Sequence, residues 1–221
     1  MLITGVRVCQ LPTTNYQPTQ RKYNPLVPDH VTSTLPPDLA SLVDAWLEIE
    51  RETDALVAPL DDEQFNWSPV AGVWSIGQCF DHLNTINVEY LRRIKKAVAA
   101  ARDAGHVRCG PIAPTWFGRR FIASMEPPVR LKLRTPRRMR PAPRKLKAEV
   151  WPEFVRQHTH LRAFVSDECP GVDLNRAIFQ NPFVPLIRMR AGTGLGVLAA
   201  HDRRHLWQAQ ALRQLEGFPR S

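Results

Sequence analysis

The chain has 221 residues, of which 43% are hydrophobic and 23% charged, with a formal net charge of +9. This is enough apolar sequence for one sizeable core but not for two. No apolar run approaches the roughly 18 residues of a membrane-spanning helix, and the N-terminus lacks the basic start and apolar stretch of a signal peptide. We therefore expect a cytoplasmic protein with no membrane span.

The first predicted elements are an irregular extension and a helix. Residues 1–34 contain scattered Pro, Thr, Asn and Gln with little apolar periodicity, which indicates an irregular N-terminal extension. The remainder, residues 35–221, is predicted to form one domain. Pro36 and Pro37 suit the start of a helix, and apolar residues then recur every three or four positions. This pattern predicts a helix over residues 37–57.

A turn-rich connection leads to the second predicted helix. Ser75, with Gln78 three residues later, fits a capping box, and Gly105 is a stop signal. These signals predict a helix over residues 75–104.

The positive charge is concentrated in residues 106–147, which we call the basic segment. It holds twelve Lys or Arg against one acid, so it carries +11 and the rest of the chain about −2 (9 − 11). Its seven prolines predict a long loop, with one short helix near residues 116–125. The favoured interpretation is a solvated loop docked by Trp116, Phe117, Phe121 and Ile122. The alternatives are binding of an acidic thiol cofactor, and contact with nucleic acid or anionic lipid. Nucleic acid is disfavoured because no recognised binding module accompanies the charge. The candidate anion-binding residues are Arg119, Arg120, Arg137 and Arg138.

Two further helices complete the predicted fold. Pro152 suits the first turn of a helix over residues 152–168, and a last helix is predicted over residues 193–216. The stretch GTGLG at residues 192–196 lacks the context of a phosphate loop and predicts a flexible start to that helix. With no convincing strand, the chain is predicted to be all-α, a four-helix bundle with a long crossover loop between helices two and three.

Histidines provide the main functional signal. His201 and His205 lie four residues apart, so both project from one face of the last helix, on a stripe that also holds leucines. Such a pair can converge on one metal ion, although polar residues at a bundle surface are the commoner explanation. His82 lies on a polar strip of the second helix. If all three histidines face inward, one shared metal ion is the simplest way to give each buried imidazole a partner.

These stretches resemble a known family. WSIGQCFDHLN in the second predicted helix and AAHDRRHLWQA in the fourth are similar to the DinB-like superfamily of bacterial bundles. The family pattern is one histidine in helix two and an H-x-x-x-H pair in helix four, together binding a divalent metal. His82, His201 and His205 fill those positions. Trp67 and Trp74 also resemble the family, and the resemblance covers about residues 37–217.

The resemblance implies a bacterial metal-dependent enzyme. Characterised relatives include S-transferases and isomerases that use low-molecular-weight thiols, so we expect zinc or nickel, a small-molecule substrate and a thiol-dependent transfer or a hydrolysis. The alternative is a non-catalytic metal-bound module that recruits a partner through the basic segment. A homodimer is a further expectation.

Other polar residues are secondary candidates. Gln78, Glu89 and Gln208 are predicted to support the metal ligands or face the substrate, although ordinary polar positions are the commoner outcome. Asp202 and His158 are expected not to be ligands. The four cysteines (Cys9, Cys79, Cys109, Cys169) are widely spaced and predicted to be reduced. Cys79 lies one helical turn before His82, but a core position is favoured for it.

Overall fold

The computed structural model describes residues 35–128, 135–184 and 186–220. The described residues belong to one compact unit, residues 34–221. The extension predicted over residues 1–34, with Cys9, lies outside them.

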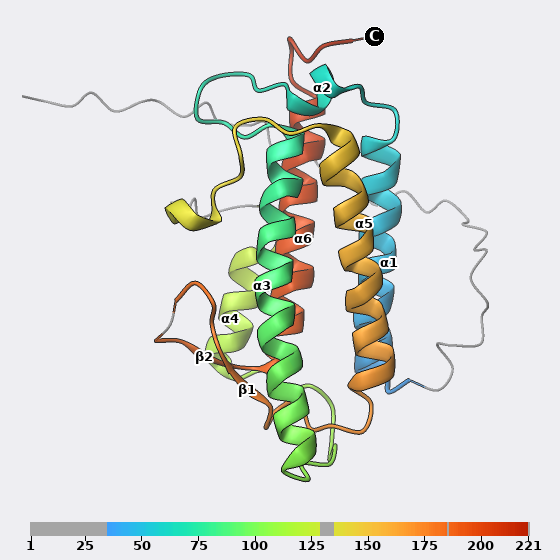
Figure 1. The fold of residues 1–221 in the computed structure, drawn as a ribbon, viewed down its shortest axis with the longest axis vertical. Helices are drawn as coiled ribbons and strands as arrows, with labels where there is room; N and C mark the ends of the chain where they lie inside the picture. The colour runs from blue at the N-terminus through green and yellow to red at the C-terminus, as the bar shows by residue number, and fades with distance from the viewer. Residues whose placement is uncertain (1–34, 129–134, 185, 221) are drawn as a thin grey trace, which may run out of the picture. The chain divides into compact units, whose positions relative to one another are not determined.

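Four long helices form the bundle that the sequence predicts. They are α1 (Pro37–Val57), α3 (Ile76–Asp103), α5 (Lys147–Ala163) and α6 (Ala191–Arg213). Helix α3 packs against α5 and α6, and α1 packs against the same two helices (Figure 1). Each helix therefore buries an apolar stripe against two neighbours, and fully buried side chains such as Trp46, Phe80, Leu161 and Leu198 fill the space between them. The all-α prediction is confirmed.

A short helix, α2 (Asp62–Asn66), lies at the start of the turn-rich connection, where the sequence analysis places no helix. Asp61 and Gln64 form a capping box, in which the Asp61 side chain accepts from the Gln64 N–H at 2.7 Å and the Gln64 side chain from the Asp61 N–H at 3.1 Å. The sequence signal, an acidic residue followed three positions later by glutamine, was therefore present.

Helix α5 begins earlier than predicted. It starts at Lys147, so Pro152 lies inside it rather than in its first turn. The reason is tertiary: the Asp62 carboxylate accepts from the Lys147 N–H at 2.7 Å, and the Lys147 ammonium donates to the Val57 and Ala58 carbonyls at the end of α1. A π-helical turn, η3 (Phe164–Glu168), continues the helix to its predicted end.

Two short strands correct the expectation of no strand. β1 (Ile178–Gln180) and β2 (Arg188–Arg190) pair antiparallel, with Phe179 opposite Met189. The hairpin formed by β1 and β2 packs against the first turn of α6. Helix α6 starts at Ala191, so Gly194 is inside the helix, where an added Cβ would lie 2.7 Å from the Phe179 ring. The predicted flexible start is thus wrong, because the three glycines of 192–196 are helical residues, two of them buried, and neighbouring side chains approach all three closely.

The basic segment is anchored at both ends. Near its start, Arg108 pairs with Asp38 at 2.5 Å, and near its end Lys145 pairs with Asp81 at 2.7 Å. Between them lie α4 (Trp116–Met125), at the predicted position, and the 3₁₀ turn η2 (Arg137–Met139). Helix α4 packs against α6.

The predicted docking residues of the basic segment divide into two groups. Phe121 and Ile122 pack against the core. Trp116 and Phe117 are 70% and 56% exposed, so for these two residues the docking prediction is wrong. The reason is helix periodicity, since α4 buries its opposite face, around Gly118, against α6. Among the described residues, no helix is both long and apolar enough to cross a membrane.

Candidate metal centre

The site is built on the first turns of α3 and the middle of α6. The predicted capping box starts α3: the Ser75 hydroxyl accepts from the Gln78 N–H at 3.1 Å, and the Gln78 side chain accepts from the Ser75 N–H at 3.0 Å. His82 follows two turns into this helix and faces α6. Because α3 and α6 pack together along their lengths, His82 meets the pair on α6.

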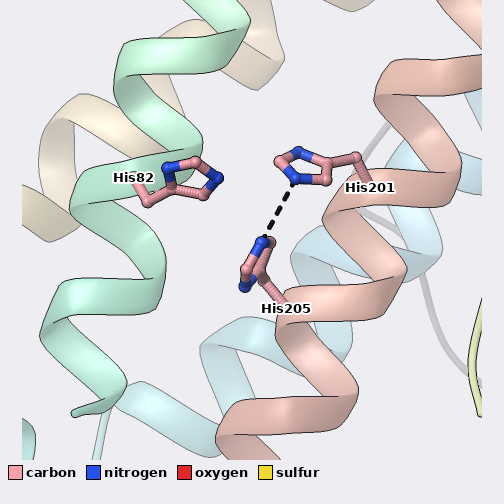
Figure 2. A group of neighbouring side chains, drawn as sticks. All are labelled: His82, His201 and His205. Atoms are coloured by element: carbon pink, nitrogen blue, oxygen red, sulfur yellow. Dashed lines mark hydrogen bonds between the residues drawn. The ribbon is translucent and has the colours of Figure 1, made fainter. Parts of the chain in front are cut away.

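Three imidazoles converge between these helices (Figure 2). The ring centroid of His82 lies 5.2 Å from that of His201 and 4.9 Å from that of His205. The centroids of His201 and His205 are 4.7 Å apart. The Nε2 atoms of His201 and His205 are 3.2 Å apart, and one ring nitrogen from each of the three lies within 4.8 Å of the others. Among the described residues, this is the group of His, Cys, Asp or Glu side chains that could hold a metal ion.

Outer contacts orient two of the rings. The His82 Nδ1–H donates to the Met139 carbonyl at 2.6 Å, and the His205 Nδ1 lies 3.1 Å from the Gln208 side-chain oxygen. A carbonyl oxygen can only accept, so the proton of each of these two rings is at Nδ1, and the His205 Nε2 accepts the 3.2 Å hydrogen bond from the Nε2–H of His201. Hydrogen bonds of this kind fix the tautomer and orientation of metal-binding histidines. Trp74 packs on both rings, stacked on His205 at 5.8 Å and tilted on His82 at 4.9 Å.

The protonation state also suits a metal. Burial, together with the neighbouring imidazoles, holds the pKa of His201 and of His205 well below the usual value. Burial also lowers the pKa of His82, although the Met139 carbonyl opposes this shift. All three rings are therefore neutral near pH 7, the form that binds a metal. Three neutral imidazoles fit one divalent ion once the proton between the His201 and His205 Nε2 atoms moves to the His201 Nδ1, which has no partner among the described residues, and they leave a coordination position for another ligand.

The secondary candidates occupy different environments. Gln208 contacts His205, as described above. The Gln78 amide donates to the Ala142 and Pro143 carbonyls of the basic segment, not to a histidine. Glu89 pairs with Arg92 at 2.8 Å on the part of α3 that faces α5. Supporting and substrate-facing roles for these three residues stay predictions.

The four candidate anion-binding arginines lie on two separate elements. Arg119 and Arg120 are exposed on α4. Arg137 and Arg138 are exposed on η2, directly before the residue whose carbonyl contacts His82. The second pair therefore adjoins, along the backbone, a residue that contacts one of the histidines. The sequence alone did not indicate this contact.

Asp202 and His158 form a buried layer behind the site. Asp202 is fully buried, and its carboxylate lies 3.3 Å from His158 Nε2. His158 Nδ1 lies 3.6 Å from the Glu50 carboxylate, so the ring is held between two acids and does not join the three histidines. Sequence reasoning missed this layer because the residues come from different helices. The Met139 contact carried no signal at all, because any residue type supplies a backbone carbonyl.

Cys79 is completely buried, and burial raises the pKa of its thiol to about 12. It is not in the group that could hold a metal. The favoured prediction of a core cysteine therefore agrees with its position.

Comparison with known proteins gives one match. Residues 45–209, well over half of the chain, match the family model described as the DinB superfamily. No curated protein and no solved structure matches the chain.

Proposed function

The chain belongs to the DinB superfamily, and from that premise we propose that it is a metal-dependent enzyme in which His82, His201 and His205 hold one divalent ion, zinc or nickel. The single observation that carries the proposal is the convergence of three neutral imidazoles at distances that one ion can bridge. When bound, such an ion would lower the pKa of a thiol or water at its open position and so supply a nucleophile at neutral pH.

Residues around the proposed ion would orient its ligands and cover the site. The Met139 carbonyl and the Gln208 side chain hold two rings in the metal-binding tautomer. Trp74 covers the same two rings and limits access of water to them. We propose that a small-molecule substrate reacts here in a thiol-dependent S-transfer or a hydrolysis.

A low-molecular-weight thiol with anionic groups is the proposed cosubstrate. Arg137 and Arg138 support this part of the proposal, because they directly precede the Met139 carbonyl that contacts His82. Replacing both by Glu should weaken thiol binding without lowering the melting temperature, since both side chains are exposed. An unchanged affinity would remove these arginines from the site.

A second candidate is a non-catalytic metal-bound module. Two observations favour it. Two cavities within the described residues lie between α3 and α5, and none of the three histidines lines either of them. Trp116 and Phe117 are exposed beside Arg119 and Arg120 on α4, a surface that suits a partner. In this case, changing Arg119 and Arg120 to Glu should weaken partner binding, whereas changing Arg137 and Arg138 should not.

Metal analysis of the purified protein tests the site. We expect about one equivalent of metal, and well below one in His201→Ala, because two imidazoles hold an ion far less tightly than three. His160→Ala is the matched control, since His160 is exposed on α5. His158→Ala is a poorer control, because it would leave two buried carboxylates without their partner. Full occupancy in His201→Ala would refute the site.

A turnover screen with low-molecular-weight thiols and electrophiles separates the two candidates. The enzyme proposal expects turnover that His201→Ala abolishes and His160→Ala leaves intact. Metal at one equivalent without turnover would favour the module. The oligomeric state, for which we propose a homodimer, can be read from the same preparation by light scattering.

A further inference from the structure

A cavity of about 300 Å³ lies between α3 and the start of α5, whereas the three histidines lie between α3 and α6. Four carboxylates line it: Asp81, Glu89, Glu149 and Glu153. The lining contains one cationic side chain, Lys145, so the cavity is acidic in a chain whose net charge is +9. Nothing in the proposed metal chemistry uses this cavity.

Two buried amide side chains in the lining lack a partner for their oxygens. Asn84 is 8% exposed and donates through Nδ2 to the Val150 carbonyl at 3.0 Å. Gln157 is 5% exposed and donates through Nε2 to the Glu153 carboxylate at 2.5 Å. With their N–H groups engaged, the Asn84 Oδ1 and Gln157 Oε1 atoms have no hydrogen-bond partner among the described residues. Buried polar atoms are rarely left unpaired, so these two oxygens point to a missing donor.

The carboxylates add further acceptors. The Glu149 side chain is exposed and has no partner among the described residues. Glu89 and Glu153 are paired with Arg92 and Arg156 three residues further along their own helices, at the edge of the cavity. Such exposed helix pairs are weak and each leaves the carboxylate able to accept another bond.

The donors in the lining are already engaged. The Lys145 ammonium is bound to Asp81 at 2.7 Å, and the Thr85 hydroxyl donates to the Asp81 carbonyl at 3.1 Å. The available groups are therefore hydrogen-bond acceptors, and most carry negative charge. A ligand that complements them must donate hydrogen bonds, carry positive charge and accept none, which describes an ammonium group.

We propose that this cavity binds a small aliphatic ammonium ligand of the diamine class. A neighbouring cavity of about 210 Å³ shares Gln157 but is lined by Arg92, Lys95 and Arg156. The lining of this second cavity holds no carboxylate to attract an ammonium group, so the ligand is confined to the acidic end. This favours a short diamine over a long polyamine.

Calorimetric titration of the full-chain protein with 1,4-diaminobutane at low ionic strength tests the proposal. We expect saturable binding that weakens as salt is added, and no binding of the uncharged 1,4-butanediol. The double variant Glu149→Gln/Glu153→Gln should weaken diamine binding at least about tenfold. The matched control is Glu63→Gln/Glu216→Gln, which removes the same charge from exposed positions outside the cavity and should leave the affinity unchanged.

Side-chain amide NMR signals locate the ligand independently of the variants. The diamine should shift the signals of Asn84 and Gln157 at the same concentrations that saturate the heat of binding. The proposal is overturned if the diamine does not bind, if the diol binds as well, if the two double variants bind equally, or if these two amide signals do not move.

Discussion

Asp202 links all four long helices, and its replacement by asparagine should destabilise the protein strongly. The residue lies on α6 and is completely buried. Its carboxylate accepts from the Trp46 indole N–H of α1 at 3.2 Å and from the Asn87 amide of α3 at 3.2 Å. The same carboxylate lies 3.3 Å from the His158 ring of α5. A single side chain therefore accepts hydrogen bonds from two other helices and forms a buried ion pair with a third.

The expected loss of unfolding free energy follows from the interactions that Asp202→Asn removes. The asparagine keeps the shape but removes the charge, and its NH₂ group replaces one of two accepting oxygens. Removing one partner of a buried ion pair costs about 3–5 kcal/mol. His158 keeps its second carboxylate, Glu50, so we expect the lower end, about 3 kcal/mol of unfolding free energy at pH 6. This is a large part of the roughly 5–15 kcal/mol by which a typical domain is stable.

Urea unfolding at pH 6, followed by circular dichroism and tryptophan fluorescence, measures the loss. The midpoint should fall with little change in the slope m, which would show that the two proteins expose the same surface on unfolding. Asp54→Asn, at an exposed position on α1, is the control and should change stability by less than about 0.5 kcal/mol. A loss below about 1 kcal/mol for Asp202→Asn would refute the reasoning.

Three further predictions concern pH, packing and thiol reactivity. Burial lowers the pKa of His158, but the Asp202 and Glu50 carboxylates together have the larger effect and raise this pKa above 6.5. The charged His158 ring therefore stabilises the folded protein fully below pH 6.5, and this stabilisation is lost as the pH rises through the folded-state pKa. Urea titrations should show a larger gap between wild type and His158→Gln at pH 6 than at pH 9, and an equal gap would contradict the charge assignment. Gly194→Ala should lower stability by about 1–3 kcal/mol, because its Cβ would lie 2.7 Å from a phenylalanine ring. Gly196→Ala should cost less in the same denaturation assay, because its Cβ would meet only a flexible isoleucine end at 3.0 Å. In the native protein, maleimide should label exposed Cys109 quickly and Cys79 slowly, as peptide mass spectrometry would show; comparable rates would mean that Cys79 is accessible.

Local sequence determined much of the secondary structure. The capping box at Ser75 and Gln78, the prolines at 36 and 37, and the apolar spacing each act within a few residues of where they appear, so α1 and α3 could be placed from the sequence. Helix α4 was also placed correctly within the basic segment. The convergence of the histidines followed from helix periodicity and from the resemblance to the DinB family, because i, i+4 spacing fixes a shared face before any tertiary contact is known.

The tertiary structure decided whatever depended on residues far apart in the chain. Lys147 begins α5 because it reaches the end of α1, and no local signal near Pro152 reveals that contact. The glycines at the start of α6 are helical residues against which side chains distant in sequence pack closely, Phe179 of the hairpin on Gly194, Ile112 on Gly192 and Ile122 on Gly196, and no local signal reveals these contacts. The Met139 carbonyl orients His82 although every residue type carries the same carbonyl. Side-chain chemistry and periodicity can be read from a sequence, whereas backbone contacts and long-range ion pairs exist only once the chain has folded.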